Sequence, residues 1–336
     1  LGLDARFFDH RLSFTFDWYH KKTKDWLVQA PVLASYGTAA PYINGGDVVN
    51  KGVELSLGWR DNINDFNYSA LINLSHNKNE VTRIANTEKI IHSGVRLGNV
   101  ASEFARAEEG YPIGYFYGYQ TDGLFQTPED VQNYKNSEEV VIMPNAVPGD
   151  VRFVDRNDDG IIDDKDKTMI GKSNPDYNLG INLNMSYKGF DLTLVASGVF
   201  GNDILRAYRM PDSPSQNYTS EILGRWTGPG TSNSIPRISS GNHINRSYIS
   251  DLYLEDGSYV RMSNVTLGYD FKKLWKSLPF EQVRFYISAQ NLFTITGYSG
   301  MDPEIGTSTG ENWISGVDFG FYPTPRTFMV GASIKF

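Results

Sequence analysis

The chain has 336 residues, no cysteine and a formal net charge of -8. The missing cysteine excludes disulfides, thiol catalysis and cysteine-ligated zinc, and the negative charge argues against a nucleic-acid-binding protein, which carries a clustered basic face. No apolar run reaches the roughly 18 residues of a membrane-spanning helix. Residues 1–6 have neither the basic start nor the apolar core of a signal peptide.

Apolar and polar residues alternate along nine segments of about 9–12 residues, the length at which a tilted strand crosses a bilayer. In chain order the segments are 1–8, 11–20, 51–60, 65–76, 177–188, 190–200, 259–271, 281–293 and 327–336. In the clearest of them, Leu179, Ile181 and Leu183 alternate with Asn182 and Asn184. Because a period of two is the signature of a strand with two different faces, the sequence predicts an all-β, antiparallel fold.

The connections between these segments differ in length. Short turns are expected at 9–10, 61–64, 188–189 and about 272–281, and long connections at 22–50, 77–176, 201–258 and 294–326. Short turns at one end and long loops at the other are typical of outer-membrane barrels, whereas loops longer than about 15 residues are uncommon in a sandwich. The pattern favours a transmembrane β-barrel over a loop-rich extracellular β protein.

The number and direction of the strands lead to a further expectation. Nine is odd, whereas bacterial single-chain barrels have even numbers of strands. If the carboxyl terminus lies on the short-turn side, directions alternate only when 77–176 is one external excursion, with the strand-like stretch 114–119 at the rim. The sequence thus predicts the carboxyl-terminal portion of a larger barrel, with two open edges that the missing part pairs.

One charge interrupts the apolar face of the segment 259–271. Arg261 stands where an apolar residue is expected, and the apolar pattern resumes only at Val265. A β-bulge shifts the pattern by one residue, so we predict a bulge near Ser263 and Asn264. We expect it at the outer rim of the barrel, where a charge costs little.

Seven short motifs occur along the chain. They are Lys51-Gly52-Val53-Glu54-Leu55, Gly123-Leu124-Phe125, Pro148-Gly149-Asp150, Tyr187-Lys188-Gly189-Phe190-Asp191-Leu192, Glu255-Asp256-Gly257-Ser258-Tyr259-Val260-Arg261, Gln290-Asn291-Leu292-Phe293 and Tyr322-Pro323-Thr324-Pro325-Arg326-Thr327. In their order and spacing they resemble the SusC/RagA family of TonB-dependent outer-membrane transporters from Bacteroidetes.

The resemblance implies a 22-stranded barrel of which residues 1–336 form the last nine strands, with the plug domain absent from them. It implies active import of oligosaccharides or peptides across the outer membrane, driven by the TonB complex through the missing amino-terminal part. It also implies a SusD-like surface lipoprotein as a lid, with outer-membrane lipid around the wall. The protein is expected to be a transporter and not an enzyme, and to bind no nucleic acid.

Within the excursion, residues 155–166 fit a twelve-residue calcium loop, whose oxygen ligands stand at positions 1, 3, 5, 7, 9 and 12. The residues at these positions are Asp155, Asn157, Asp159, Ile161 (through its carbonyl), Asp163 and Asp166. Gly160 at position 6 permits the sharp turn. The aspartate at position 12 is dockerin-like, since EF-hands prefer glutamate there, and 151–154 before the loop has the pattern of a strand. We predict bound calcium, with an acidic turn that holds no ion as the alternative.

The catalytic motifs in the sequence are incomplete. Gly306–Gly310 matches G-x-S-x-G, but its surroundings are loop-like and no histidine follows His243. The stretch 171–173 resembles the end of a phosphate loop, but Asp166 stands where its first glycine belongs. The five histidines, at positions 10, 20, 76, 92 and 243, form no metal-binding motif.

The long loops contain aromatic residues that could stack on sugar rings or pack the loops together: Tyr208, Tyr218, Trp226, Tyr298 and Trp313. Sequence alone assigns none of them to a substrate. Two alternative functions remain open. One is a secreted β-rich glycan-binding module with a dockerin-like calcium loop, which would be soluble without detergent. The other is a passive porin, which would have neither plug nor TonB box.

Overall fold

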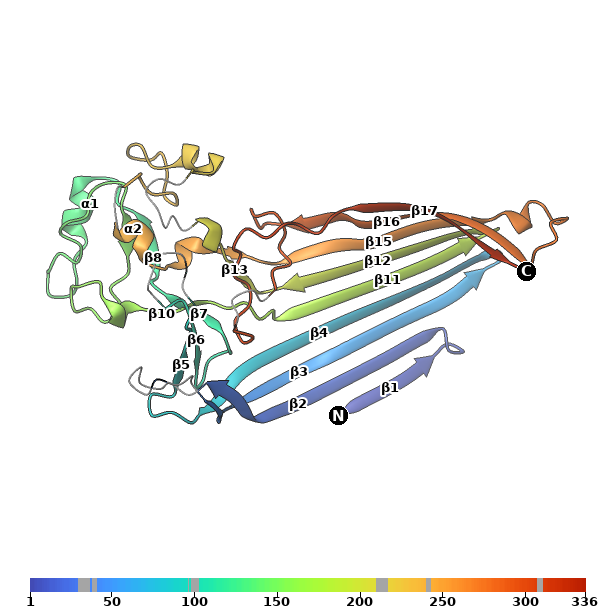
Figure 1. Ribbon diagram of the computed structural model, residues 1–336, viewed down its shortest axis with the longest axis horizontal. Helices are drawn as coiled ribbons and strands as arrows, with labels where there is room; N and C mark the ends of the chain where they lie inside the picture. The colour runs from blue at the N-terminus through green and yellow to red at the C-terminus, as the bar shows by residue number, and fades with distance from the viewer. Residues whose placement is uncertain are drawn as a thin grey trace.

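The computed structural model describes residues 1–29, 37, 41–95, 97, 103–209, 217–239, 243–306 and 311–336. Its largest element is a nine-stranded antiparallel sheet with the strand order β1-β2-β3-β4-β11-β12-β15-β16-β17 (Figure 1). The strands are β1 (Gly2–Phe7), β2 (Leu12–Gln29), β3 (Tyr42–Ile63), β4 (Phe66–Ile84), β11 (Tyr177–Tyr187), β12 (Phe190–Phe200), β15 (Tyr259–Asp270), β16 (Gln282–Thr296) and β17 (Thr327–Lys335). The nine predicted segments all lie in this sheet, which confirms the antiparallel all-β prediction.

The short turns and the carboxyl terminus lie at one end of the sheet, and the long connections lie at the other (Figure 1). Lys188 and Gly189, which join β11 to β12, have φ angles of 47° and 95°. Positive φ at both central residues is what a two-residue hairpin requires to match the twist of its strands. The predicted turn is therefore present, and it places these two strands in direct register.

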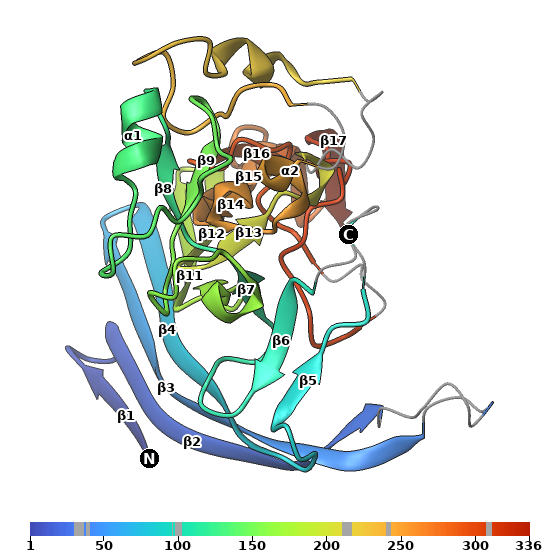
Figure 2. The same cartoon turned by 90° about the vertical axis from the view of Figure 1, so that its left-hand side faces the viewer.

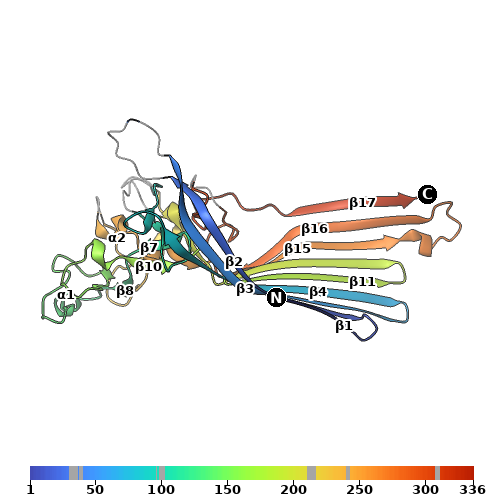
Figure 3. The same ribbon diagram turned by 90° about the horizontal axis from the view of Figure 1, so that it is seen from below.

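Three strands extend beyond their predicted limits. β2 continues to Gln29, β3 begins at Tyr42 and β4 continues to Ile84, so the prediction of a long loop over 22–50 is wrong. The extended ends of β2, β3 and β4 project past the part of the sheet that carries the apolar face. Apolar alternation therefore ends near residue 20, while the backbone hydrogen bonding between the strands continues. Figure 3 shows β2 and β3 bending out of the line of the other strands.

The two faces of the sheet differ in chemistry. Large apolar side chains of one face are exposed, among them Leu74, Ile287 and Val330. The other face carries polar side chains that bond along and across strands, as Asn184 Nδ2 donates to Asn182 Oδ1 at 2.8 Å and Thr193 Oγ1 to Asn184 Oδ1 at 3.0 Å. β5 and β6 lie on the concave side of the sheet (Figure 2). The polar face points to this side, because Asn79 of β4 accepts there from the N–H of Ile113, between β6 and β7, at 2.8 Å. The sheet thus has an apolar outside and a polar inside.

Residues 85–176, 201–258 and 297–326 gather at the far end of the sheet, and we call their described part the loop domain. Its elements are β5 (Ile90–His92), β6 (Ala105–Glu108), β7 (Tyr115–Gly118), β8 (Thr121–Leu124), α1 (Pro128–Asn133), β9 (Val151–Phe153), β10 (Thr168–Gly171), β13 (Asp203–Leu205), α2 (Ile244–Ser247) and β14 (Leu254–Asp256). β10, β7, β6 and β5 form a four-stranded sheet, while β13 pairs with β14 and β8 with β9. As expected, the stretch 114–119 lies here without crossing. Within the described ranges, no helix has the length and hydropathy needed to span a membrane.

The predicted β-bulge is present in β15. The pairing of β15 with β12 and with β16 shifts register around Ser263, which turns Arg261 onto the inner face. Arg261 is only 4% exposed; its guanidinium pairs with Asp302 and, at 2.6 Å, with Glu304. Arg261 lies at the loop-domain end of β15, as expected for the rim, but the expectation of an exposed outward charge is wrong. The bulge turns the side chain to the inner face, where carboxylates of the loop 297–326 neutralise it.

Candidate functional site: a cavity in the loop domain

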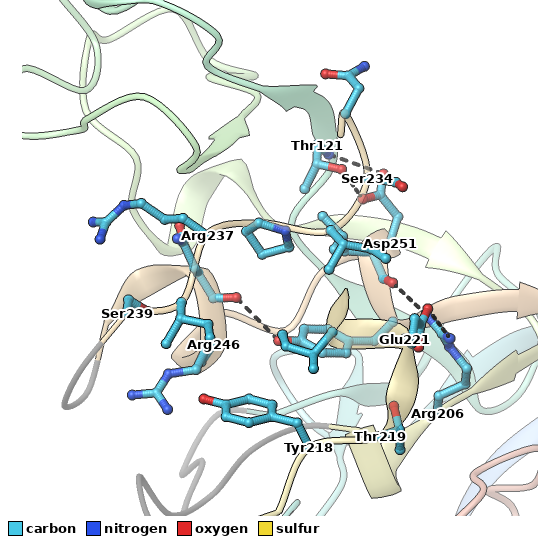
Figure 4. Close-up of a pocket in the computed structure, with 18 of the residues that line it drawn as sticks. Thr121, Arg206, Tyr218, Thr219, Glu221, Ser234, Arg237, Ser239, Arg246 and Asp251 are labelled. Atoms are coloured by element: carbon cyan, nitrogen blue, oxygen red, sulfur yellow. Dashed lines mark hydrogen bonds and ion pairs between the residues drawn. The ribbon is translucent and has the colours of Figure 1, made fainter. Parts of the chain in front are cut away.

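The loop domain contains a cavity of about 720 Å³ that is open to solvent on one side and is lined by residues from segments far apart in the sequence (Figure 4). Its walls come from the start of β8, from the residues after β13, from 217–239 and from 245–254. Ligand pockets typically have volumes of about 300–1,000 Å³, so the cavity has the size of a small-molecule or oligomer subsite. Figure 4 shows Arg237 and Arg246 on one side of it and Arg206 and Glu221 on the other.

One wall of the cavity is fixed by buried and half-buried hydrogen bonds. Asp251 accepts from the backbone N–H of Thr121 at 3.1 Å and from its hydroxyl at 2.6 Å, which ties β8 to the segment before β14. Tyr253 donates its hydroxyl to the carbonyl of Asn245 at 3.2 Å. Burial raises the pKa of Tyr253 to about 12, so this phenol stays neutral and acts as a donor at physiological pH.

Two of the arginines that line the cavity, Arg206 and Arg237, are paired with carboxylates. Arg206 is 9% exposed and lies 2.5 Å from a carboxylate oxygen of Glu255 and 3.6 Å from one of Glu221. Arg237 donates its Nε to Asp150 at 2.7 Å. A cavity of this kind presents hydrogen-bond donors and acceptors without a strong excess of one charge, which suits a neutral polar ligand.

The five loop aromatics singled out from the sequence separate into two groups. Tyr208 and Tyr218 line the cavity, and Tyr218 is 45% exposed. The other three contact protein groups. Trp226 donates its ring N–H to Gln126 at 3.1 Å, Tyr298 donates its hydroxyl to Asp318 at 2.5 Å, and Trp313 packs edge-on against Trp26.

Sequence reasoning missed the charged and hydrogen-bonding lining of the cavity. Thr121 and Asp251 are 130 residues apart in the chain, and no motif or spacing marks them as neighbours. The same holds for Arg206, whose carboxylate partners come from two other segments. The one sequence feature that indicated this region was the set of loop aromatics, two of which, Tyr208 and Tyr218, line the cavity.

The predicted calcium loop, 155–166, connects β9 to β10 and is closed by its own backbone. Asp155 accepts from the N–H groups of Asp158 and Gly160, both at 2.8 Å. Asp166 is fully buried and accepts from the N–H groups of Arg156 and Asp163, both at 2.8 Å. Gly160 has a φ of 81°, as the sharp turn at position 6 requires.

The loop chemistry is compatible with calcium, although the carboxylates do not converge. Among the residues that the structure describes, no three histidine, aspartate or glutamate side chains are grouped to hold a metal ion. Lys165 Nζ lies 3.3 Å from Asp159 and 3.6 Å from Asp163. The hydrogen bond from the side chain of Asn157 lowers the pKa of Asp159, and each ionised carboxylate has about four acceptor sites. The calcium site stays a prediction.

Side chains of two of the remaining candidate motifs form ordinary ion pairs within the protein. Lys172 of the stretch 171–173 is ion-paired with Asp176. His92 lies between Glu88 at 3.1 Å and Glu103 at 2.9 Å. In the motif 306–310, residues 307–310 lie outside the described residues.

Comparison with known proteins gives consistent similarities. The family model described as TonB dependent receptor-like, beta-barrel, matches residues 1–200. Over its whole length the chain is 33% identical to TonB-dependent receptor P3 of Formosa agariphila and 29% identical to TonB-dependent receptor SusC of Bacteroides thetaiotaomicron. It spans about a third of the length of these curated relatives, 33% and 31%.

A solved structure of the RagAB peptide transporter has the same fold. It superposes on 100% of the chain with a TM-score of 0.76 and 23% identity, and the match covers 34% of that structure's chain. A second one, of the RagAB peptide importer in an open state, gives a TM-score of 0.74.

Proposed function

Because this chain belongs to the family of TonB-dependent receptor-like β-barrels, proteins of the outer membrane, we propose that it supplies barrel wall and outer loops to an importer of oligosaccharides or peptides. We further propose that it is the carboxyl-terminal portion of the barrel. The observation that supports import best is a ligand-sized cavity in the loop domain, at the end of a sheet with a polar concave face. A ligand held there would lie at the entrance to a polar passage.

The energy source and the partner are proposed from the relatives. Several of them are named TonB-dependent receptors, so the TonB complex would drive uptake through the amino-terminal part of the whole protein. A SusD-like surface lipoprotein would cover the loop domain, as the likeness to SusC and RagAB suggests. The role is transport, and catalysis forms no part of the proposal.

The chemistry of the cavity favours a neutral, hydrogen-bonding substrate. Arg206 and Arg237 are paired with carboxylates, and Tyr208 and Tyr218 offer flat rings beside polar groups. Such a lining would serve sugar rings, through stacking and hydroxyl contacts, or the backbone of a peptide. The solved relative is titled a peptide transporter, so both substrate classes belong in the test.

Uptake by the full-length protein tests the proposal. A strain with Tyr218→Ala should grow more slowly than wild type on the oligosaccharide or peptide that the protein imports, because the substitution removes an exposed ring of the cavity. Tyr322→Ala is the matched control, since Tyr322 is 89% exposed and does not line the cavity. Uptake that continues after collapse of the proton-motive force would identify a passive porin. A full-length protein that is soluble and monodisperse without detergent would identify a secreted module.

We also propose that the loop 155–166 binds calcium in its aspartate and asparagine oxygens. Six aspartates fall within its twelve residues, and their mutual repulsion would be relieved by a divalent cation. The ion would stiffen the connection between β9 and β10 and serve a structural role.

A further inference from the structure

The outward face of β2, β3 and β4 changes character between two adjacent rows of residues. In one row, Trp18 pairs with Val53, which pairs with His76. Two residues further toward the loop domain, on the same face, the next row consists of His20, Lys51 and Lys78 in direct register. Three basic side chains, all exposed, therefore stand side by side on three neighbouring strands.

The basic row lies at the level where the apolar band of a barrel ends. From Ile63 to Val53, β3 makes ten residue steps, or about 33 Å at a rise of about 3.3 Å per residue. With a strand tilt of about 40° this corresponds to about 25 Å along the membrane normal, the height of the apolar band in outer-membrane barrels. The first row, with Trp18 and with His76 beside Tyr177 at 4.8 Å between ring centroids, matches an interfacial aromatic girdle.

The charges of the basic row are not compensated within the described part of the chain. No ion pair involving His20, Lys51 or Lys78 occurs among the described residues, and Glu80, two residues beyond Lys78 on the same face, makes none there. Like charges directly opposite each other on paired strands destabilise the sheet. The pairing of Lys51 with Lys78 is therefore unfavourable unless an anion from outside the chain lies between them.

Nearer to the loop domain, the same strands carry charges that are neutralised internally. Asp47 lies 3.2 Å from Lys22 and 3.0 Å from Arg83, and Arg83 lies 2.9 Å from Asp25. The basic row differs from these charges in that it places three basic side chains in direct register on one face, without an ion pair among the described residues. Lysine binds phosphate as a point charge, and its long stem can follow apolar surface while its ammonium reaches the headgroup level.

We propose that His20, Lys51 and Lys78 bind a phosphate group of an outer-leaflet lipid headgroup. The site rests on the outer-membrane location and on the loop domain facing outward, and it is independent of which nutrient is imported. We infer a lipid phosphate from the position of the row at the edge of the apolar band, because the phosphate of a lipid headgroup is held at this height of the membrane, whereas a free phosphate is not.

The test uses the full-length protein in nanodiscs of phosphatidylcholine to which lipid A or phosphatidylglycerol is added. Bound lipid A or phosphatidylglycerol, whose phosphates carry a net negative charge that zwitterionic phosphatidylcholine lacks, is counted by native mass spectrometry after extraction. The double variant Lys51→Gln, Lys78→Gln should bind these lipids about ten- to thirtyfold more weakly, as expected for the loss of two cations near an anionic surface. Lys21→Gln is the matched control, because Lys21 adjoins His20 on β2 and faces the other side of the sheet.

Two further arms decide between the possible ligands. Lys51→Arg with Lys78→Arg should keep lipid binding, and the heat-modifiable mobility of each variant reports that its barrel is folded. Displacement of the lipid by inorganic phosphate at millimolar concentration would assign the row to a free anion and overturn the proposal. Equal lipid retention by wild type and by a folded Gln double variant would overturn it as well. Loss of nutrient uptake alone would bear on the proposed function and not on this site.

Discussion

The nine-stranded sheet and the loop domain are stabilised by different kinds of contact. Strands of the sheet have up to 22 residues, and the large side chains of their outer face are exposed for contact with lipid. Strands of the loop domain have three or four residues, and all four residues of β7 are buried. Around them, aromatic rings pack on one another, as Tyr119 stacks on Tyr248 at 4.5 Å between ring centroids and Phe153 meets both rings edge-on.

The difference shows which features of the sequence determine the structure of each region. In the sheet, a slip of one residue would move every apolar side chain to the polar face, so alternation specifies which face each residue takes, and the short turns fix the rest of the register. In the loop domain, single polar side chains hold the backbone of distant segments. Asn233, for example, accepts from the N–H of Leu124 at 2.9 Å, and Asn245 accepts from the N–H of Val151 at 3.1 Å. Substitutions that target these two modes should have different consequences.

The largest effect is expected where the two regions meet, at Arg261. Arg261→Ala would leave Asp302, which is 7% exposed, buried without its cation. Removing one partner of a buried ion pair costs about 3–5 kcal/mol, so we expect a clear fall in the urea midpoint of the full-length protein in detergent. Arg11→Ala is the control, because Arg11 pairs with Asp61 at 3.1 Å while its side chain is 47% exposed, and exposed pairs contribute about 0–1 kcal/mol.

A rescue variant separates charge burial from lost packing. Arg261→Met with Asp302→Asn removes both charges. Glu304 and Thr324 donate their N–H groups to different oxygens of Asp302, so the single amide oxygen of the asparagine keeps one of the two hydrogen bonds. The double variant should therefore recover part of the lost stability. If it is as unstable as Arg261→Ala, the ion pair is not what joins the loop domain to the sheet.

The second prediction concerns the two faces of the sheet. Leu183 and Asn184 are neighbours on β11, and their side chains point to opposite faces. An arginine at the midplane of the lipid face costs about 2–4 kcal/mol, so Leu183→Arg should be much less stable in vesicles than Asn184→Arg, whose side chain enters the polar interior. Equal unfolding midpoints for the two variants would show that the outward face does not meet lipid.

The sequence predicts the structure of the sheet much better than that of the loop domain, because the sheet is specified by alternation and the loop domain by single contacts. Alternation located the nine strands, and the misplaced charge of Arg261 located the bulge at Ser263, because lipid contact imposes a simple rule on one face. Where that rule stops, the extensions of β2, β3 and β4 went unrecognised, since polar residues beyond the apolar band carry no period. The cavity could not be predicted, because its walls are brought together by single contacts such as that of Thr121 with Asp251.

The third prediction tests packing on the inner face, at Gly268. A Cβ at this position would lie 2.5 Å from a carboxylate oxygen of Asp191 and 2.6 Å from Nε of Arg284. These two residues form a double hydrogen bond, at 2.8 and 2.5 Å, across the glycine. Gly268→Ala should therefore separate them and cost about 1–3 kcal/mol, as overpacking typically does. Gly180→Ala is the control on the same face, because a Cβ there meets only Asn73, at 3.8 Å. Equal urea midpoints for the two variants would contradict the packing seen across β12, β15 and β16.

The smallest effect on overall stability is expected from the loop 155–166, whose calcium prediction bears on local order alone. Calcium sites of extracellular modules have affinities of about 10⁻⁴–10⁻³ M, so protection of this loop from protease should rise over millimolar calcium and fall on addition of a chelator. Asp155→Ala with Asp159→Ala should abolish the calcium-dependent part of the protection, because it removes the carboxylates at positions 1 and 5, while the barrel stays heat-modifiable.

Asp164→Ala is the matched control, since Asp164 lies in the same loop outside the predicted ligand set and pairs with Lys167. Protection of the wild-type loop that is the same with calcium and with chelator would show that the segment is an acidic turn closed by its own backbone hydrogen bonds, and the metal prediction would then be wrong.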